Sequence, residues 1–492
     1  MTAVLEKTAL ALNWIAGEWT GSEHILESFD PATGNVIGTY ASGGEETAKA
    51  CIKAAQRAFK ESPWKRDRQL RYKVLNQLAD AYERHTDELV ELLALENGKI
   101  KPEARFEVEM VPHKLRYYAS LTRTDYGHAV EAKPGTMSVV IRQAMGVAAI
   151  ITPWNSPVVL MIRSLAPALA AGCTTVVKMP GQSAQVAHLM SKIMAEAADL
   201  PKGVINLFSE GKGGGGSKYL IEAPEVPTIS FTGSTATGRS ISAVGAKNIK
   251  RFGLELGGKT PMLVFADADL DQAIPKLQQA LTVFAGQFCM TGSRLLVHRS
   301  VADAVRTRLA ERLAAVKVGP AADPSSEMGP VIDKENVARI NKVVEEAIAA
   351  GAKVIVRGGP ATDGPLASGA FYAPTLLEIS DSKLPIAQQE TFGPVLTMQV
   401  FDTEQQAIDL ANDSEYGLAA SIWSRDLDLP MRVARELDAG TIWFNDWAVI
   451  YDEMEEGGFK QSGAGRLNGR AALEDFLEYK HITFSPGLVG AH

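Results

Sequence analysis

A cysteine and a glutamate in two separate segments have the side-chain types that covalent catalysis requires. Cys289 lies in the sequence Gly-Gln-Phe-Cys-Met at residues 286–290, and Glu255 lies between two leucines, just before Gly257 and Gly258. A thiolate is a strong nucleophile, and an apolar setting raises the pKa of a carboxyl group towards neutrality, which suits a general base. Each residue also has an ordinary explanation. A lone cysteine in an apolar segment is usually inert core, and a glutamate before two glycines is commonly part of a solvated turn.

Two further segments lie where a strand turns into a helix. In residues 152–157, Ser156 is a good N-cap and Pro157 suits the first helical position. This places Asn155 at the carboxyl edge of a sheet, where ligands of α/β proteins bind. In residues 231–234, exposed backbone amides and a hydroxyl could hold a phosphate. Taken alone, either segment is more often an ordinary turn.

A glycine run also matches a dinucleotide-binding pattern. Gly211, Gly213 and Gly216 satisfy G-x-G-x-x-G between a predicted strand at 204–208 and a predicted helix at 217–222. Four consecutive glycines satisfy many patterns, and no acidic residue follows convincingly about 20 positions later to hold a ribose. A loop beside a dinucleotide and a flexible surface turn therefore both remain open.

The elements that must position these residues alternate along the chain. Helix-period segments at 46–59 and 68–97 precede short apolar runs at 147–152, 174–178, 204–208, 228–232 and 262–265. Strands that alternate with helical stretches predict βαβ units and a mainly parallel, doubly wound sheet. A second alternating series, from 294 to 447, predicts another α/β domain, and residues 135–143 alternate like a hairpin arm.

Composition favours a small-molecule partner. Fifty basic and 58 acidic residues give a net charge of −8 without clustered basic runs, which disfavours nucleic-acid and membrane-surface binding. The cysteines Cys51, Cys173 and Cys289 are odd in number and far apart, so we expect neither a disulfide framework nor a metal site. The longest charge-free apolar region, between Arg163 and Lys178, is too short and too polar for a membrane span. We expect a cytoplasmic protein.

Taken together, the motifs resemble those of the aldehyde dehydrogenase superfamily. The matching segments are ITPWN at 151–155, Lys178 at the end of its strand, FTGST at 231–235, LELGGK at 254–259, GQFC at 286–289, ETFGPV at 390–395 and GGFKQSGAGR at 457–466. The resemblance implies an α/β fold with three parts. These are a Rossmann-type cofactor domain at 1–123 and 145–254, a catalytic domain at 255–456, and a small β oligomerisation arm with the C-terminal tail at 124–144 and 457–492. A homodimer or homotetramer is expected.

The resemblance also implies the chemistry. Cys289 would attack the aldehyde carbon, and the amide of Asn155 and the backbone N–H of Cys289 would hold the oxyanion. After hydride transfer to NAD or NADP, Glu255 would activate the water that hydrolyses the thioester. Lys178 completes the expected catalytic set. A family branch that transfers the acyl group to coenzyme A generally lacks this glutamate, so we expect a free acid as product.

Cofactor contacts carry over from the resemblance residue by residue. Lys178 and Glu390 match positions that bind the two riboses, and Trp154, Ser234 and Phe392 match residues that line the adenosine, pyrophosphate and nicotinamide. The full expected set is Ile151, Thr152, Trp154, Lys178, Gly181, Gly211, Phe231, Gly233, Ser234, Leu256, Glu390 and Phe392. Two positions depart from the family pattern. Gly181 stands where many NAD-preferring members have a glutamate, so NADP should be tolerated, and Ser217 stands where many have glycine.

The substrate is predicted mainly from Arg163. Asn155, Val159 and Arg163 recur at four-residue spacing, so they share a face of the helix expected at 157–166. In the family, arginine here accompanies carboxylate-bearing semialdehydes or aromatic aldehydes, whereas an ion pair with an internal carboxylate is the structural alternative.

Small and aromatic side chains near these residues favour an aromatic aldehyde. The side chains expected to line the substrate site with Arg163 are Ser156, Phe288, Trp443 and Tyr451, with Phe444 and Trp447 also available. A semialdehyde resembling succinic semialdehyde is the alternative. A cysteine hydrolase is remote, because none of the eight histidines lies in the matched motifs.

Overall fold

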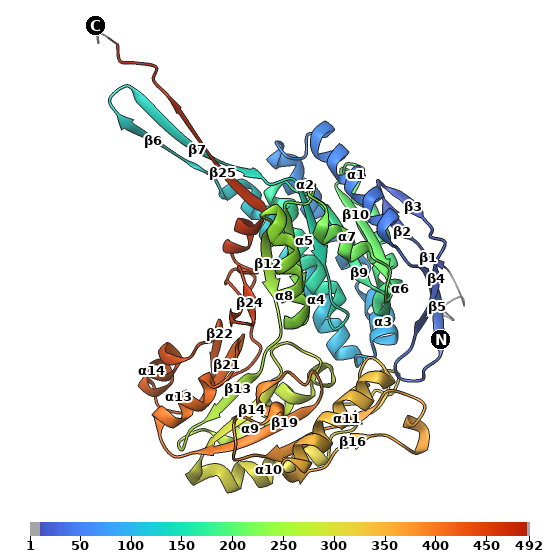
Figure 1. The fold of residues 1–492 in the computed structure, drawn as a ribbon, viewed down its shortest axis with the longest axis vertical. Coiled ribbons are helices and arrows are strands. Elements are labelled where there is room, and N and C mark those ends of the chain that lie inside the picture. The colour runs from blue at the N-terminus through green and yellow to red at the C-terminus, as the bar shows by residue number, and fades with distance from the viewer. Residues whose placement is uncertain (1–9, 490–492) are drawn as a thin grey trace.

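The computed structural model describes residues 10–489. The chain forms two lobes, each built on a mostly parallel sheet, and a long three-stranded arm that extends away from the first lobe (Figure 1). The first lobe contains the N-terminal half of the chain, and the second contains most of the C-terminal half.

The sheet of the first lobe has a parallel centre with antiparallel strands at both edges. Its order is β24 (Gly463–Ala464), β12 (Arg251–Glu255), β11 (Thr228–Thr232), β8 (Val147–Ile151), β9 (Thr174–Pro180), β10 (Ile205–Glu210), β2 (Asn13–Ile15) and β3 (Glu18–Thr20). The five strands from β12 to β10 pair in parallel. All five residues of β8 are buried, as expected for a parallel strand covered on both faces.

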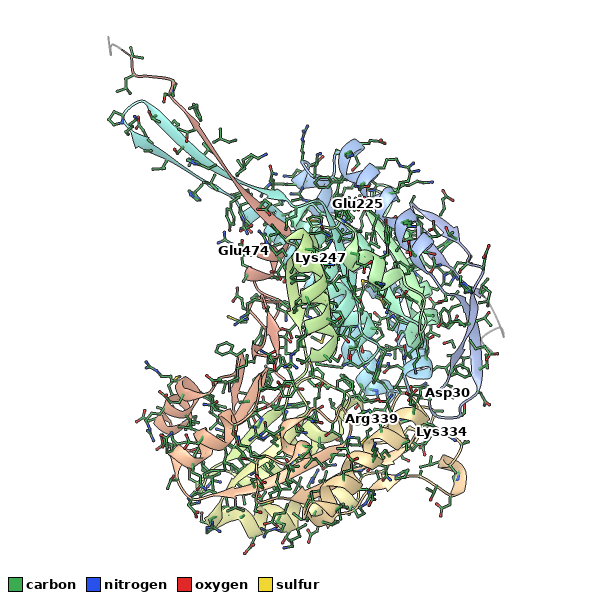
Figure 2. All side chains as sticks on the ribbon, viewed as in Figure 1. Asp30, Glu225, Lys247, Lys334, Arg339 and Glu474 are labelled. Carbon is green, nitrogen blue, oxygen red and sulfur yellow. The ribbon has the colours of Figure 1, made fainter. Side chains whose placement is uncertain are left out.

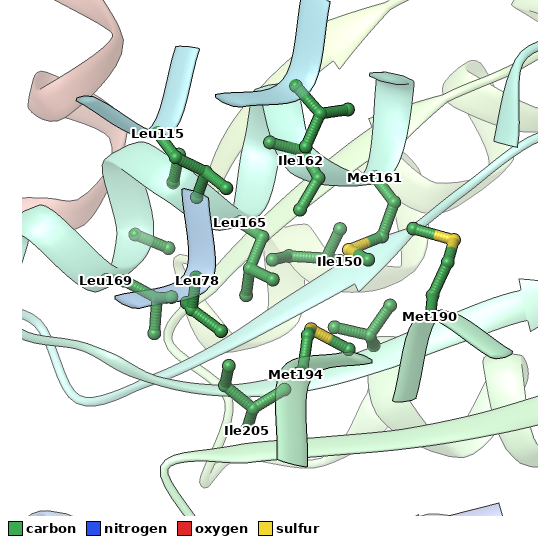
Figure 3. Packing of buried hydrophobic residues seen from close by; sticks show 14 of the residues in the cluster. Leu78, Leu115, Ile150, Met161, Ile162, Leu165, Leu169, Met190, Met194 and Ile205 are labelled. Carbon is green, nitrogen blue, oxygen red and sulfur yellow. The ribbon is translucent and has the colours of Figure 1, made fainter. Parts of the chain in front are cut away.

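Helices cover both faces of this sheet. One face packs against α2 (Arg68–Arg84), α3 (Thr86–Asn97), α4 (Lys101–Thr124), α5 (Pro157–Ala171) and α6 (Ala184–Ala195), and the other packs against α1 (Glu45–Glu61), α7 (Gly216–Glu222) and α8 (Thr235–Gly245). Alternate residues of β8 serve the two cores, since Ile150 packs with the first group and Ile151 with the second. Figure 3 shows Ile150 beneath Leu165 of α5, with the methionines of α6 alongside.

The second lobe repeats this arrangement with a seven-stranded sheet. Its order is β15 (Lys353–Val356), β18 (Thr375–Glu378), β19 (Val395–Phe401), β14 (Gly292–His298), β13 (Thr260–Val264), β21 (Ala419–Trp423) and β22 (Thr441–Phe444), and only β15 pairs antiparallel. Its helices are α9 (Leu270–Thr282), α10 (Ala302–Ala314), α11 (Lys334–Ala349), α12 (Pro385–Gln388), α13 (Glu404–Asn412) and α14 (Asp428–Glu436).

The arm consists of β6 (His128–Lys133), β7 (Thr136–Ala144) and the C-terminal β25 (Leu477–Phe484), which pairs antiparallel along the whole of β7 except its first residue. Three small sheets complete the structure: β1 (Leu10–Ala11), β5 (Val36–Ala41) and β4 (Ile25–Phe29); β16 (Gly359–Pro360) and β17 (Tyr372–Ala373); and β20 (Tyr416–Gly417) and β23 (Phe459–Lys460). Among residues 10–489, no helix is both long enough and apolar enough to cross a membrane.

The predicted fold class is confirmed, and two details differ from the sequence-based expectation. The helix-period segment at 68–97 forms two helices, because the chain leaves helical geometry at His85. The His85 ring lies 2.6 Å from Glu196, the C-cap residue of α6. The strand β12 was not predicted. Its sequence, Arg-Phe-Gly-Leu-Glu, contains charged ends and a glycine, and it is stabilised as a strand by pairing with β11 and β24.

Candidate active site

Cys289 lies in a loop that enters β14 from a left-handed turn. Phe284, Ala285 and Gly286 have φ values of 53°, 52° and 70°. A Cβ at Gly286 would lie 2.3 Å from the carbonyl carbon of Gly393, so only glycine fits between these two backbones. The turn therefore fixes the direction from which the chain reaches the cysteine.

Two other motifs contact this loop directly. The Asn155 side-chain amide donates a hydrogen bond to the carbonyl of Gln287 at 2.9 Å. A Cβ at Gly258 would lie 2.5 Å from the carbonyl oxygen of Cys289, so the glycines after Glu255 allow that backbone to pack against the cysteine. Residues 155, 255 and 289, which are far apart in sequence, are thus brought to one place at the junction of the two sheets.

The position of Asn155 depends on the helix that follows it. Ser156 is at the N-cap position of α5, as expected, but its hydroxyl makes no capping bond and instead accepts from the Lys99 ammonium at 2.9 Å. Capping comes from Glu107 of α4, which accepts from the backbone N–H groups of Val158 and Val159 at 2.9 and 3.2 Å. A carboxylate at a helix N-terminus also favours the helix dipole.

The carboxyl group of Glu255 is at the end of β12 and only 2% exposed. Its Oε2 atom has no hydrogen-bond partner among the described residues. Burial raises the pKa of Glu255 to about 8, although the charge of Arg163 acts in the opposite direction. At neutral pH the group is therefore mostly protonated, and it becomes a base in mildly alkaline solution.

Burial also raises the pKa of the Cys289 thiol above its ordinary value. The positive charge of Arg163 opposes this effect, and the carboxyl groups of Glu255, Glu456 and Glu390 add to it. The thiolate is consequently a minor species until a base takes its proton, and Arg163 is the cation whose charge favours it.

A cavity of about 650 Å³ is lined by residues of both lobes. It reaches Ser156 and Phe288, the chain neighbours of Asn155 and Cys289. Aromatic and aliphatic side chains form most of its wall, among them Phe106, Met110, Val159, Phe284, Phe288 and Trp447. Charged side chains also line it, including Glu103, Glu107, Lys114, Lys276 and Glu327. Phe288 packs edge-on against both Phe284 and Trp447, with ring centres 5.7 and 5.8 Å apart. Ser156 and Arg163 also line the cavity.

Arg163 both lines the cavity and forms an internal ion pair, the two alternatives considered for it. Its side chain faces the cavity, yet its Nη1 atom lies 3.1 Å from Glu456, which is 5% exposed, and its Nη2 atom lies 3.2 Å from the hydroxyl of Thr232. The positive charge is therefore matched by a buried carboxylate inside the protein.

Two of the expected substrate residues lie outside this lining. Trp443 on β22 is buried, and its indole N–H donates to the carbonyl of Val449 at 2.8 Å. Tyr451 is 61% exposed. Trp447, which was also expected there, does lie in the wall, and its indole N–H donates to the carbonyl of Met290 at 2.8 Å.

The residues expected to bind a cofactor lie at the carboxyl ends of the first sheet's strands. Thr152 donates its N–H to the carbonyl of Lys178 at 3.1 Å, joining the ends of β8 and β9. Gly233 donates its N–H to the carbonyl of Glu255 at 3.0 Å, and Ser234 caps α8 by accepting from Thr237. Ile151, Phe231 and Leu256 are buried in the core beneath this edge.

The remaining cofactor positions come from both lobes: Glu390 and Phe392 precede β19 of the second sheet, whereas Trp154, Gly181 and Gly211 follow strands of the first. Glu390 accepts from the N–H of Gly258 at 3.1 Å, and burial raises its pKa to about 7. The rings of Trp154 and Phe392 meet edge-on, 5.5 Å apart, with Phe392 in a left-handed conformation. Gly181 and Gly211 approach each other: a Cβ on Gly181 would lie 3.3 Å from the Cα of Gly211.

No cluster of His, Cys, Asp or Glu side chains within residues 10–489 has the arrangement of a metal site. Cys51 and Cys173 are fully buried, whereas Cys289 is partly exposed.

Comparison with known proteins identifies the family. A model of the aldehyde dehydrogenase family matches residues 19–482. Betaine aldehyde dehydrogenase of Bacillus subtilis is 38% identical over 95% of this chain and 96% of its own, and 2-aminomuconic semialdehyde dehydrogenase of Danio rerio is 36% identical over 96% and 97%. A crystal structure of betaine aldehyde dehydrogenase from Staphylococcus aureus in complex with NAD+ superposes with a TM-score of 0.94 at 36% identity, covering 98% of this chain and 96% of that one. The chain belongs to the aldehyde dehydrogenase family.

As an aldehyde dehydrogenase, the protein uses NAD(P)+ to oxidise aldehydes. The edge of the first sheet fits such a cofactor. Lys178 is almost buried, and its ammonium makes no hydrogen bond within the described part of the chain, the nearest carboxylate being 4.0 Å away. The buried hydroxyl of Thr152 also lacks a partner there. Both are donors that a polar ligand at this edge could satisfy.

Several residues that build the site of this aldehyde dehydrogenase were not identified from its sequence. Glu107, Lys99 and Glu456 are charged residues in helical or glycine-rich segments, where a charge usually indicates a solvated surface. Arg339 of α11 (Figure 2) donates to the carbonyl of Thr391, next to Glu390. Each of them reaches the site by contacting a residue more than 40 positions away in the sequence. No local sequence pattern indicates such contacts.

The packing of Gly258 against Cys289 generates a test. Gly258→Ala should reduce kcat by about 100-fold, because a methyl group 2.5 Å from the Cys289 carbonyl must displace the reacting loop. Steady-state kinetics and the melting temperature should be measured together. Gly21→Ala, where no atom lies within 4 Å of the new methyl, is the control and should leave kcat unchanged. Activity of Gly258→Ala within twofold of the parent would show that the contact does not position the cysteine.

Proposed function

We propose that the enzyme oxidises an aromatic aldehyde to its carboxylic acid through a thioester on Cys289. The observation that carries the choice of substrate is the buried ion pair between Arg163 and Glu456, in the wall of a cavity whose lining surface is mainly apolar and aromatic. The alternative is a carboxylate-bearing semialdehyde, which is the kind of substrate named for the Schizosaccharomyces pombe succinate-semialdehyde dehydrogenase, 34% identical to this chain.

In the proposed mechanism, the sulfur of Cys289 adds to the aldehyde carbon, and the carbonyl oxygen becomes an oxyanion. Asn155 already donates one amide hydrogen to Gln287, which orients the group and leaves its second amide hydrogen for the oxyanion. The backbone N–H of Cys289 is the other proposed donor. Removal of one such donor typically costs about 100- to 1,000-fold in rate.

The bound nicotinamide would accept the hydride lost from the aldehyde carbon. Lys178 and Glu390 would bind its riboses, and Ser234 and the amides at the start of α8 would lie beside its pyrophosphate. Trp154 and Phe392 form a rigid aromatic pair that would border the rings. This assignment uses groups from both lobes, so the cofactor would lie across the junction that also contains Cys289.

Glu255 would complete turnover by taking a proton from water as the water attacks the thioester. The attack releases the acid and returns Cys289 as a thiol. Because Glu255 is almost completely buried and its Oε2 atom has no partner, its carboxylate has an unused acceptor for this water. Its pKa of about 8 makes it a stronger base than an exposed glutamate once it is ionised.

The Arg163–Glu456 pair argues against a carboxylate as the substrate's distal group. A carboxylate bound to Arg163 would lie beside Glu456, and two carboxylates in a buried site repel each other. A neutral aromatic ring meets no such charge, and its face and edge can pack against Phe288 and Trp447. The Arg163 guanidinium can still donate to a hydroxyl or methoxy substituent on the ring.

We further propose that the arm joins subunits into a homodimer or homotetramer, the usual state of the family. The free faces of β6 and β25 carry exposed apolar side chains, including Val130, Tyr479, Ile482 and Phe484, which are costly to leave in water. Glu474, at the base of the arm (Figure 2), binds Arg142 and so ties the arm to the body.

The pKa of Glu255 predicts the pH dependence of acid release. Below pH 8 a falling fraction of the group is ionised and able to act as a base, so steady-state turnover should rise through a midpoint near pH 8. Glu255→Gln should give one rapid burst of NADH per site followed by slow, pH-independent turnover, as measured by stopped-flow absorbance. Asp475→Asn removes another buried acid with a pKa of about 7, near Arg251 and Glu474, and should keep the midpoint. Normal steady-state turnover in Glu255→Gln would mean that another group activates water.

The ion pair predicts how substrate preference can be changed. The parent enzyme should have a higher kcat/KM for benzaldehyde than for succinic semialdehyde. Glu456→Gln leaves the charge of Arg163 unmatched, so the ratio should shift towards the semialdehyde by about 10-fold or more, the value of a charge-assisted hydrogen bond. Using the ratio cancels any effect on Glu255 or Cys289 that both substrates share.

Glu327→Gln is the matched control, because Glu327 lines the same cavity but bonds the backbone N–H of Lys317. It should leave the ratio unchanged. A parent enzyme that prefers succinic semialdehyde by more than about tenfold, a difference of about 1.4 kcal/mol in transition-state binding, would refute the aromatic assignment.

A further inference from the structure

The glycine run and Ser217 are explained by a residue that sequence analysis passed over. Glu210 is the last residue of β10, and in the parallel ladder it lies opposite Pro180 of β9, two residues after Lys178. Both charged side chains therefore leave the sheet at its carboxyl edge. The Lys178 ammonium lies 4.0 Å from Oε2 of Glu210, closer than any other carboxylate within the described chain.

The run of glycines holds this carboxylate in place. Glu210 accepts from the backbone N–H of Gly216 at 2.5 Å and from that of Ser217 at 3.1 Å, and the Ser217 hydroxyl donates to it as well. A Cβ at Gly214 would lie 2.8 Å from the Glu210 side chain, so the loop can fold around the carboxylate only with glycine there. Three donors from the loop therefore fix the position of this carboxylate.

At Gly181, the space for a side chain is already filled. A Cβ at this position would lie 2.1 Å from the hydroxyl of Tyr40, which is 4% exposed and packed on α6. The position three residues after Lys178 therefore has no acidic group of its own. Glu210, on the neighbouring strand, instead places a negative charge beside the same lysine.

We propose that Glu210 determines cofactor preference by placing a fixed negative charge beside the adenine-ribose site, which makes the enzyme prefer NAD+ over NADP+. The inference rests on the assignment of Lys178 to that ribose in the proposed function. A ribose 2′-hydroxyl can donate to a carboxylate, whereas a 2′-phosphate carries nearly two negative charges and is repelled by it. The absence of an acidic side chain at Gly181 then does not make the two cofactors equivalent.

The competing explanation is that Glu210 only stabilises the start of α7. A purely structural carboxylate would affect the stability of the loop and weaken both cofactors to the same extent. A charge that discriminates would change their ratio. The dissociation constants of NADH and NADPH, measured by quenching of protein fluorescence without any aldehyde, distinguish these explanations without depending on catalysis.

In the parent enzyme, NADPH should bind at least about tenfold more weakly than NADH. Glu210→Gln keeps a side-chain oxygen for the loop N–H groups but removes the charge, so it should tighten NADPH binding relative to NADH by about tenfold or more. Glu335→Gln, which removes an exposed charge next to Lys212 in the same region, is the control and should leave the ratio unchanged. Titration with adenosine 2′-monophosphate should show the same change as NADPH.

An unchanged ratio in Glu210→Gln would overturn the proposal, as would equal affinities for NADH and NADPH in the parent, a result that does not depend on how the variant folds. Lys178→Met tests the underlying assignment separately. If Lys178 binds the ribose, this variant weakens both dinucleotides. If it weakens neither, the ribose assignment fails, and the proposal for Glu210 fails with it.

Discussion

The hydrogen bond from the Asn155 amide to the Gln287 carbonyl connects the two lobes at the point where chemistry takes place. Asn155 ends the turn after β8 of the first sheet, and Gln287 lies in the loop before β14 of the second. The bond holds only if α5 begins at a fixed place, and that place is set by Glu107, which caps the helix and is paired with Lys99. A buried ion pair of this kind contributes little net stability, but loss of one partner is costly. Its effect here is to fix position.

The packing of the two lobes also determines which charged groups lie beside Cys289 and Glu255. One guanidinium, that of Arg163, is paired with Glu456, and its charge lowers the pKa values of Glu255 and of the Cys289 thiol against the effect of burial. It favours the thiolate and counters the rise in the pKa of Glu255, and it is itself held by Glu456. Cys289 and Glu255 therefore require different surroundings. The nucleophile requires a nearby positive charge, whereas the general base requires an apolar surrounding that keeps its pKa high.

The sequence predicts the fold class and the strand ends well because both depend on local patterns. Strands β8, β9 and β11 are short apolar runs, and the segments at Asn155 and Ser234 carry the turn and capping residues that follow such strands. The strand β12 and the partners of Arg163 and Lys178 could not be predicted in this way. Glu456 and Glu210 look like surface charges beside glycines, and only the sheet order brings them to buried cations. The sequence allows an ion pair between Arg163 and an internal carboxylate such as an Asp on the neighbouring helix, whereas the partner in the structure is Glu456.

The central claim is that the converging loops make Cys289 the residue that carries the acyl group. Mass spectrometry of peptides from acid-quenched Glu255→Gln enzyme, after incubation with NAD+ and benzaldehyde, tests this directly. We expect a benzoyl group on the peptide containing Cys289 and on neither of the buried cysteines, Cys51 and Cys173. Unmodified Cys289 in enzyme that has produced its burst of NADH, or an acyl group on another residue, would contradict it.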